Sequence, residues 1–514
     1  MIATNVRRLG FYLILAFAVV SGSLVWWQVI EAPGLAVRAD NPEVIAARRS
    51  LMRGNIFDAS GQLLASSEVI DGLSRRTYTD PAFTHVIGYA SFRFGSTGIE
   101  REFEDLLVGQ TDPNPLRDLI NDVLARQPQP RDLTLTIDRR LQSFAAEQLG
   151  GDAGAVVAID PRTGAVLAMV STPTFDATPI SGDPATAQGP MDALRNDPAE
   201  PLIPRARQGR YVPGSIMKVF TAAAALDADV ITPSTTYEDQ PRQETEGFVV
   251  EGFTIREHDL GGIQPDLWPL SPALQVSSNI FFAHVGLDLG ADLFLEYGRR
   301  FGFCSAHEIG PPGRALTVAP SYLTAPVDGD CGDFGDDVEL ASAAFGQGRT
   351  QVTPMQMALL AAAIAGDGVM PHPYIVRDVR EHAEGDSPSD TVLDRFGSRG
   401  GSRVVGTETA RETRAAMVDA VNAEMGRLFA GQGDVTLYGI SDARSAGKTG
   451  TAQLGGEQAP HSWFIGFAPA QEGAEPEIAI AVLVESGGSG SGRAAPIGGQ
   501  VMAEWLRLSG ADGD

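Results

Sequence analysis

An uncharged apolar segment near the start of the chain restricts what the rest of the sequence can fold into. Residues 9–30, LGFYLILAFAVVSGSLVWWQVI, carry no charged side chain. A helix of this length spans about 33 Å at about 1.5 Å per residue, enough to cross a bilayer core of about 30 Å. Arg7 and Arg8 precede the segment, which predicts a cytoplasmic N-terminal end, and Trp26 and Trp27 suit the opposite interface. We therefore expect a single-pass membrane anchor that leaves the rest of the chain outside the cytoplasm.

A cleaved signal peptide is the alternative interpretation of the same segment. The sequence AFA at residues 16–18 resembles a cleavage site. Apolar residues continue beyond it, however, which a cleavage site should not show. The pattern therefore favours an uncleaved anchor.

Composition excludes several classes of protein. A chain of 514 residues is too long for one ordinary core, so two or three domains are expected. A formal net charge of -26, without a basic stripe of domain size, argues against nucleic-acid binding. Cys304 and Cys331 are too few for a disulfide framework or a Cys-rich metal site; outside the cytoplasm they could pair, or they could be two small buried residues. The seven histidines lack metal-ligand spacing, so no metal or other cofactor is indicated.

The part of the chain after the apolar segment predicts a small mixed region. Residues 53–66 indicate two short strands around an Asp-Ala-Ser-Gly turn. Residues 109–132 contain several prolines around one short amphipathic helix, which is typical of a linker. Residues 133–138 alternate as a strand does, and residues 139–149 have helical spacing.

The remainder predicts an α/β sandwich. Residues 154–173, GAVVAIDPRTGAVLAMVSTP, indicate a strand, a turn and a second strand, which together form a hairpin. Helical stretches follow, and the chain closes with strands and a helix; the clearest are helices at 215–228 and 354–366, strands at 462–470 and 477–486, and a helix at 499–508. Strands at both ends with helices between them predict a sheet that is completed by late strands, although the pattern does not give their order.

Lysine is almost absent from this chain. Of 39 Lys and Arg residues, only Lys218 and Lys448 are lysines. Lys218 lies in VPGSIMKVF, where Pro213 and Gly214 precede a helix start and Ser215 is three residues before the lysine, on the same helix face. A buried lysine can take a proton from a serine hydroxyl, whereas arginine effectively never deprotonates. Taken alone, the pattern also fits a serine that caps a helix beside a surface lysine.

Two further motifs follow along the chain. Ser277 and Asn279, in VSSN, could relay a proton and hold an amide, although a helix cap is the better interpretation of this motif when it is taken alone. Lys448 lies in SAGKTGTA, where Gly-Lys-Thr suggests a phosphate-binding loop. That loop needs a glycine at position 442, and the chain has Asp442 there. The remaining interpretation is a strand edge with an ammonium and two hydroxyls that can receive a carboxylate.

The motifs S-x-x-K, S-x-N and K-T-G occur here in the order of one known catalytic set, and both lysines belong to them. The chain resembles the penicillin-binding proteins, specifically the membrane-anchored monofunctional transpeptidases of class B. The resemblance covers nearly the whole chain and includes RGNIFDASGQLLA (53–65), THVIGY (84–89) and GSTGIEREFEDLLVG (95–109). One departure is Ser278, where the catalytic set has Asp.

The resemblance implies a role for each motif residue. The family cross-links peptidoglycan stem peptides that end in D-Ala-D-Ala and is trapped by β-lactams. The resemblance implies that Ser215 is the nucleophile and that Lys218 is its base. It also implies that Ser277 protonates the departing D-Ala, that Asn279 holds the substrate through its amide, and that Lys448 receives the substrate carboxylate. The substrate-binding residues are Thr449, Gly450 and Thr451, and the oxyanion hole is formed by the N–H groups of Ser215 and Thr451.

The resemblance also implies a domain order and a partner. It implies an α/β (α+β) fold in which a transpeptidase domain (151–514), with an antiparallel sheet flanked by helices, follows a stub (1–8), the anchor (9–30) and a small mixed pedestal or dimerisation-type domain with its linker (31–150). The family usually works beside a polytopic membrane glycosyltransferase.

Two alternatives remain beside a transpeptidase. A membrane-anchored serine β-lactamase would share all three motifs, but it leaves the N-terminal region unexplained and needs a base for a deacylating water. A non-catalytic scaffold or β-lactam sensor would not need intact motifs. The sequence does not distinguish division, elongation and sporulation.

Overall fold

The structure of the protein is a computed structural model. It describes residues 2–27, 51–110, 129–260, 262–430, 444–456 and 458–510. The amphipathic helix expected within residues 109–132 falls almost wholly outside this range.

The first helix, α1 (Ile2–Val25), contains the apolar segment. Its residues Val6–Val25 are long and apolar enough to cross a membrane, and none of that stretch is buried against the protein. The helix begins earlier than expected, so Arg7 and Arg8 lie within it. Residues 28–30, the end of the expected anchor, lie outside the described residues.

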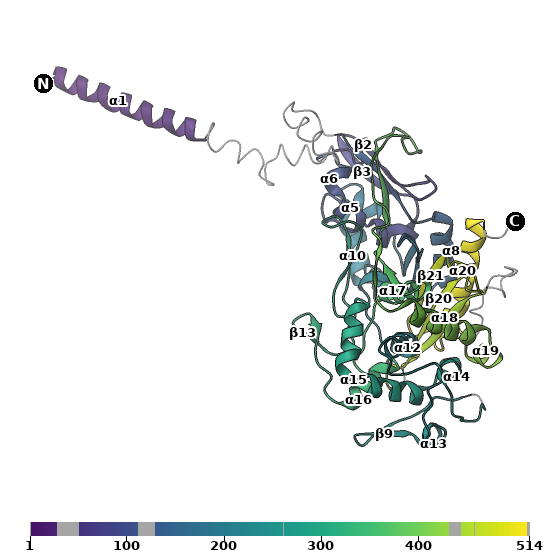
Figure 1. The fold of residues 1–514 in the computed structure, drawn as a ribbon. Helices are drawn as coiled ribbons and strands as arrows, with labels where there is room; N and C mark the ends of the chain where they lie inside the picture. The colour runs from purple at the N-terminus through teal and green to yellow at the C-terminus, as the bar shows by residue number, and fades with distance from the viewer. Residues whose placement is uncertain are drawn as a thin grey trace.

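A six-stranded sheet forms the core of the N-terminal region, at the upper end of Figure 1. Its order is β17-β16-β6-β1-β2-β3, with bounds Val392–Arg395, Val376–Glu381, Arg131–Leu135, Ile56–Phe57, Leu63–Ile70 and Leu73–Tyr78. The expected turn at 53–66 joins β1 to β2, where Asp58 accepts hydrogen bonds from the N–H groups of Ser60 and Gln62. Strands β16 and β17 come from the range expected to form the transpeptidase domain, so this sheet crosses the expected domain boundary.

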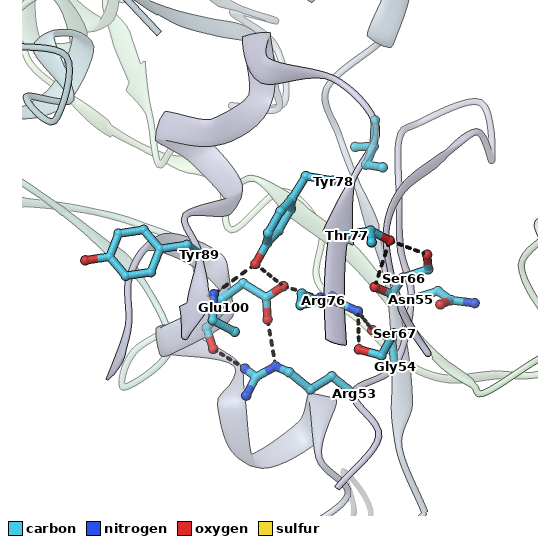
Figure 2. Close-up of polar contacts among 12 residues, drawn as sticks. Arg53, Gly54, Asn55, Ser66, Ser67, Arg76, Thr77, Tyr78, Tyr89 and Glu100 are labelled. Carbon is cyan, nitrogen blue, oxygen red and sulfur yellow. Dashed lines mark hydrogen bonds and ion pairs between the residues drawn. The ribbon is translucent and has the colours of Figure 1, made fainter. Parts of the chain in front are cut away.

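A buried ion cluster fixes this region (Figure 2). Glu100, on α5 (Gly98–Glu102), is fully buried and accepts from Arg53 Nε at 2.8 Å and from Arg76 Nε at 2.6 Å. The Tyr78 hydroxyl donates to the same carboxylate at 3.3 Å. Burial alone would raise the pKa of Glu100, but Arg76 and Arg53 hold it below its ordinary value. The cluster therefore joins three parts of the chain: the segment before β1, which carries Arg53, and the elements β3 and α5.

A second sheet, of five antiparallel strands, carries the rest of the chain. Its order is β19-β20-β21-β7-β8, with bounds Ala446–Ala452, His461–Ala468, Ile478–Val484, Gly154–Ile159 and Val166–Thr172. The hairpin expected at 154–173 is confirmed as β7 and β8. The expected completion of the sheet by late strands is also confirmed. Both faces of the sheet are buried, which explains the continuous apolar sequences of β7 and β21.

Helices cover the two faces of this sheet. α8 (Arg139–Leu149) and α20 (Ala494–Ser509) pack on one face. On the other face, α17 (Pro354–Ala365) packs on β7, β20 and β21, and α18 (Thr407–Asn422) packs on β19; α12 (Met217–Asp227) contacts α18. α8 was expected to belong to the N-terminal region, but it packs on the five-stranded sheet.

The two cysteines form a disulfide between Cys304 and Cys331, with an S–S distance of 2.00 Å. This resolves the alternative that the sequence left open, in favour of pairing. The bond closes the segment that follows α15 (Asn279–Arg300).

Replacing Glu100 by Gln is expected to lower the free energy of unfolding by about 3 kcal/mol or more, because the buried Arg76 loses its counter-ion and Arg53 keeps only the half-exposed Glu104. Thermal unfolding of the full chain in detergent measures the change. The matched control is Glu102→Gln, which removes the partner of the largely exposed Arg101 and is expected to cost less than about 1 kcal/mol. Equal effects of the two variants would contradict a structural role for the buried cluster.

Candidate active site

Ser215 lies on a tight turn that leads into a buried helix. The turn is the 3₁₀ segment η3 (Gly214–Ile216), and α12 begins directly after it. Gly214 has φ +60° and donates its N–H to Gly346 O at 2.8 Å, so a residue with left-handed backbone is needed there. Ser215 is half-buried, whereas Ile216 and the first turn of α12 are fully buried. The fold therefore presents the Ser215 hydroxyl at the edge of the core.

Lys218, in the first turn of α12, points to the second motif. Its side chain is fully buried, and Nζ donates to Asn279 Oδ1 at 2.9 Å, to Ser277 Oγ at 3.3 Å and to the Ser277 carbonyl oxygen. Within the described residues, Lys218 and Ser215 form no hydrogen bond; catalytic contacts are often long without a substrate. Burial lowers the pKa of Lys218 to about 7, although Glu257 opposes the shift. A neutral amine is therefore available near neutral pH.

Ser277 occupies a strained backbone position between two helices. α14 (Leu270–Gln275) ends in a Schellman arrangement, in which Ser277 N–H bonds Leu274 O and Ser278 N–H bonds Ala273 O. Ser277 is the residue with left-handed backbone in this arrangement, at φ +60°, where glycine is usual. Strain of this kind at a non-glycine residue is common at functional sites.

The third motif lies on β19, at the edge of the five-stranded sheet, as the sequence predicted. Lys448 is buried, and Nζ donates to Ser277 Oγ at 2.9 Å and to Thr449 O at 3.1 Å. Burial, together with the nearby charge of Lys218, lowers the pKa of Lys448 well below its ordinary value. The two lysines of the chain thus converge on one hydroxyl.

The close approach of β19 to the Ser215 turn depends on Gly450. A Cβ at this position would lie 2.9 Å from Pro213 O and 3.1 Å from Trp463 Cβ, so a side chain does not fit. Thr451 is exposed beside the turn, and its hydroxyl accepts from Gly490 N–H at 3.2 Å, while Thr449 is half-buried. All eight predicted site residues therefore belong to segments that meet here: Ser215, Lys218, Ser277, Asn279, Lys448, Thr449, Gly450 and Thr451.

Sequence reasoning missed Glu257, which belongs to a separate segment and whose carboxylate contacts the first turn of α15. Its carboxylate accepts from Asn279 N–H at 2.9 Å and from the Ser278 hydroxyl at 2.9 Å. Burial alone would raise the pKa of Glu257, but its hydrogen bond with His258 and the charge of Lys218 lower it to about 2. No motif marks this residue, since it lies 20 residues before Ser277 in an irregular segment.

Comparison with known proteins agrees with this geometry. Residues 154–503 match the family described as the penicillin binding protein transpeptidase domain, and residues 53–133 match the penicillin binding protein A dimerisation domain. A curated relative, the peptidoglycan D,D-transpeptidase PbpA of Mycolicibacterium smegmatis, is 34% identical over 98% of this chain and 99% of its own length. The D,D-transpeptidase MrdA of Escherichia coli is 28% identical over 82% of this chain and 70% of its own length.

Solved structures give the same result. The imipenem acyl-enzyme complex of penicillin-binding protein A from M. tuberculosis superposes with a TM-score of 0.75 at 31% identity, covering 90% of this chain and 100% of that one. The chain belongs to the penicillin-binding proteins that carry a transpeptidase domain, as the motifs predicted.

Substitution of Ser277 tests the strain at its backbone. Ser277→Gly and Ser277→Ala both remove the hydroxyl, but only glycine relieves a left-handed conformation that costs other residues roughly 1–2 kcal/mol. The glycine variant is therefore expected to be more stable than the alanine variant by about 1 kcal/mol in thermal unfolding. At Ser143, within helix α8, the order should reverse, because glycine is a poor helix former. The same order at both positions would contradict the strain.

Proposed function

We propose that this chain is a D,D-transpeptidase that cross-links peptidoglycan stem peptides through an acyl-enzyme at Ser215, and that β-lactams trap the same serine. One observation carries the proposal: Lys218 and Lys448 both donate to Ser277 Oγ, beside the turn that holds Ser215. The names of the relatives and the acyl-enzyme structures of a similar protein support the same reaction.

In the first step, Ser215 Oγ attacks the carbonyl carbon of the penultimate D-Ala. Its proton passes to neutral Lys218, whose pKa of about 7 leaves a substantial fraction of the amine uncharged. The developing oxyanion is held by the N–H groups of Ser215 and Thr451, and each such donor is worth about 3–4 kcal/mol. Lys448, Thr449 and Thr451 receive the terminal carboxylate of the donor peptide.

In the second step, the bond to the terminal D-Ala breaks. Ser277 gives its proton to the departing amine and regains one from a lysine, since its hydroxyl lies within 3.3 Å of both amines. Asn279 holds the substrate amide. An amine from a neighbouring stem peptide then attacks the ester carbonyl, forms the cross-link and frees Ser215. No cofactor takes part in this scheme.

The N-terminal part of the chain has a separate role in the proposal. α1 anchors the protein in the membrane with its N-terminal end in the cytoplasm, and the transpeptidase domain acts outside. The six-stranded sheet and the segments around it form a pedestal that docks a polytopic membrane glycosyltransferase. The match to a dimerisation domain of a related protein supports an interaction surface in this region.

A β-lactamase needs a base aimed at a deacylating water. Glu257 is the carboxylate whose charge acts on Lys218, but its oxygens already accept from Asn279 N–H, Ile280 N–H and the Ser278 hydroxyl. Its lowered pKa also makes it a weak base. This observation favours a transpeptidase over a β-lactamase.

Penicillin is expected to form one covalent adduct with the full chain in detergent, and Ser215→Ala is expected to form none. The adduct should persist for minutes after free drug is removed, which corresponds to a barrier of about 21 kcal/mol or more. Intact-mass spectrometry measures both. An adduct on the alanine variant would disprove the nucleophile, and loss of the wild-type adduct within seconds would indicate a β-lactamase.

The acylation rate is expected to rise with pH through an apparent pKa near 7, because the neutral form of Lys218 accepts the proton. Lys218→Arg keeps the charge but cannot accept a proton, so its rate should fall by about a thousandfold or more at every pH. Stopped-flow measurement with a fluorescent penicillin gives both profiles. A rate for the arginine variant within tenfold of wild type would show that Lys218 is not the base.

A further inference from the structure

The second motif of this chain lacks the aspartate of the S-D-N pattern, since Ser278 is its middle residue. An aspartate there could accept the unpaired N–H groups at the start of α15 and place a negative charge near the lysines. Ser278 does cap the helix, because its hydroxyl accepts from Phe281 N–H at 3.1 Å. A neutral hydroxyl satisfies only one such donor and supplies no charge.

Glu257 supplies what Ser278 lacks. Its Oε1 accepts from Asn279 N–H at 2.9 Å, and its Oε2 accepts from Ile280 N–H at 3.2 Å and from the Ser278 hydroxyl at 2.9 Å. The Glu257 side chain is 2% exposed. One carboxylate from another segment therefore satisfies two helix N–H groups and orients the capping serine.

These contacts lie directly beside the reacting groups. Asn279, whose N–H bonds Glu257, also accepts from Lys218 Nζ through Oδ1 at 2.9 Å. Ser277, two residues earlier in the motif, accepts hydrogen bonds from both lysines through Oγ. A shift of the first turn of α15 would therefore move Asn279 Oδ1 and Ser277 Oγ relative to Lys218.

We propose that Glu257 is the positioning residue of this site. Although it lies on a separate segment, it has the role that an aspartate at position 278 would have. It fixes the start of α15, and through Asn279 and Ser277 it fixes the amine of Lys218. The inference rests on the proposed function, because it assigns a part in the acylation of Ser215. Glu257 acts through Asn279 and Ser277 and does not contact the substrate in the proposed mechanism.

The charge of Glu257 has a second effect, on Lys218. The carboxylate raises the pKa of the amine and so limits the lowering caused by burial. Other titratable side chains lie near Glu257 and Lys218: Lys448 on β19, Glu244 on α13 (Gln240–Glu246) and His258. Asp266 lies near Glu244. Loss of the Glu257 charge removes the attraction that opposes burial, so the pKa of Lys218 falls further and the neutral amine is favoured.

The experiment compares five forms of the full chain in detergent: wild type, Glu257→Gln, Glu257→Ala, Ser278→Asp, and the double variant Glu257→Ala with Ser278→Asp. The probe is a fluorescent penicillin, and the readout is the rate of acylation as a function of pH. The control is Asp336→Asn, because Asp336 also caps a helix, α16 (Asp337–Ala344), through a bond to Glu339 N–H at 2.8 Å. Thermal unfolding shows which variants fold.

Glu257→Gln is expected to lower the maximal acylation rate by roughly tenfold to a hundredfold, the range for loss of a charged hydrogen-bond partner. Its acidic limb should move to lower pH, because the pKa of Lys218 falls when the carboxylate is neutralised. The double variant should acylate at least about tenfold faster than Glu257→Ala, since it returns a carboxylate to the start of α15. Ser278→Asp alone should be slower than wild type, because it adds a like charge beside Glu257 and Glu244. Asp336→Asn should match wild type.

A rate for Glu257→Gln within twofold of wild type, with an unmoved acidic limb, would overturn the proposal. So would a folded double variant that is no faster than Glu257→Ala. Hydrogen exchange at the amides of Asn279 and Ile280 tests the positioning without any reaction: exchange should accelerate in Glu257→Ala and slow again in the double variant, and unchanged exchange would also overturn the proposal. If wild type itself is not acylated, the proposed function fails, while the exchange result still decides the role of Glu257.

Discussion

The hydroxyl of Ser277 is the contact on which the rest of the site depends. Lys218 reaches it from a buried helix at 3.3 Å, and Lys448 reaches it from an edge strand at 2.9 Å. Burial lowers the pKa of both amines, and the charge of Lys218 lowers the pKa of Lys448 further, so two full charges at this oxygen are disfavoured. A hydroxyl can accept from a charged amine and donate to a neutral one. The three motifs are therefore one hydrogen-bonded unit, which the proton transfers of the proposed mechanism require.

The backbone supplies the geometry that this unit needs. Ser277 reaches the space between the amines because it ends α14 in a left-handed conformation, at φ +60°. β19 can lie against the Ser215 turn because Gly450 has no side chain, and a Cβ there would lie 2.9 Å from Pro213 O. Both conditions concern contacts between segments far apart in the sequence. The site is therefore a product of how the five-stranded sheet packs against η3 and α14, and not of any one motif.

The sequence predicted what local patterns control. The hairpin of β7 and β8, the late strands β20 and β21, and helices α17 and α20 follow from apolar periodicity, and the motif residues follow from type, spacing and order. It did not predict that β16 pairs with β6, because strand pairing across more than 200 residues leaves no local signal. Glu257 was missed for the same reason: its partners are backbone N–H groups of another segment, which no residue type reveals. The disulfide stayed open because two cysteines alone do not specify whether they pair.

The chain uses its two kinds of cation for different tasks. In the pedestal, Arg53 and Arg76 hold one carboxylate, Glu100, from two sides. Guanidinium suits this task because it stays charged when it is buried and presents donors in a fixed plane. In the proposed mechanism the task is reversed, since a fixed charge at Lys218 would block acceptance of the Ser215 proton. An amine can lose its charge through burial, and its single nitrogen can turn between several acceptors. Of 39 basic residues only Lys218 and Lys448 are lysines, and both contact Ser277. In this chain, lysine is therefore confined to the place where the proposed mechanism exchanges protons.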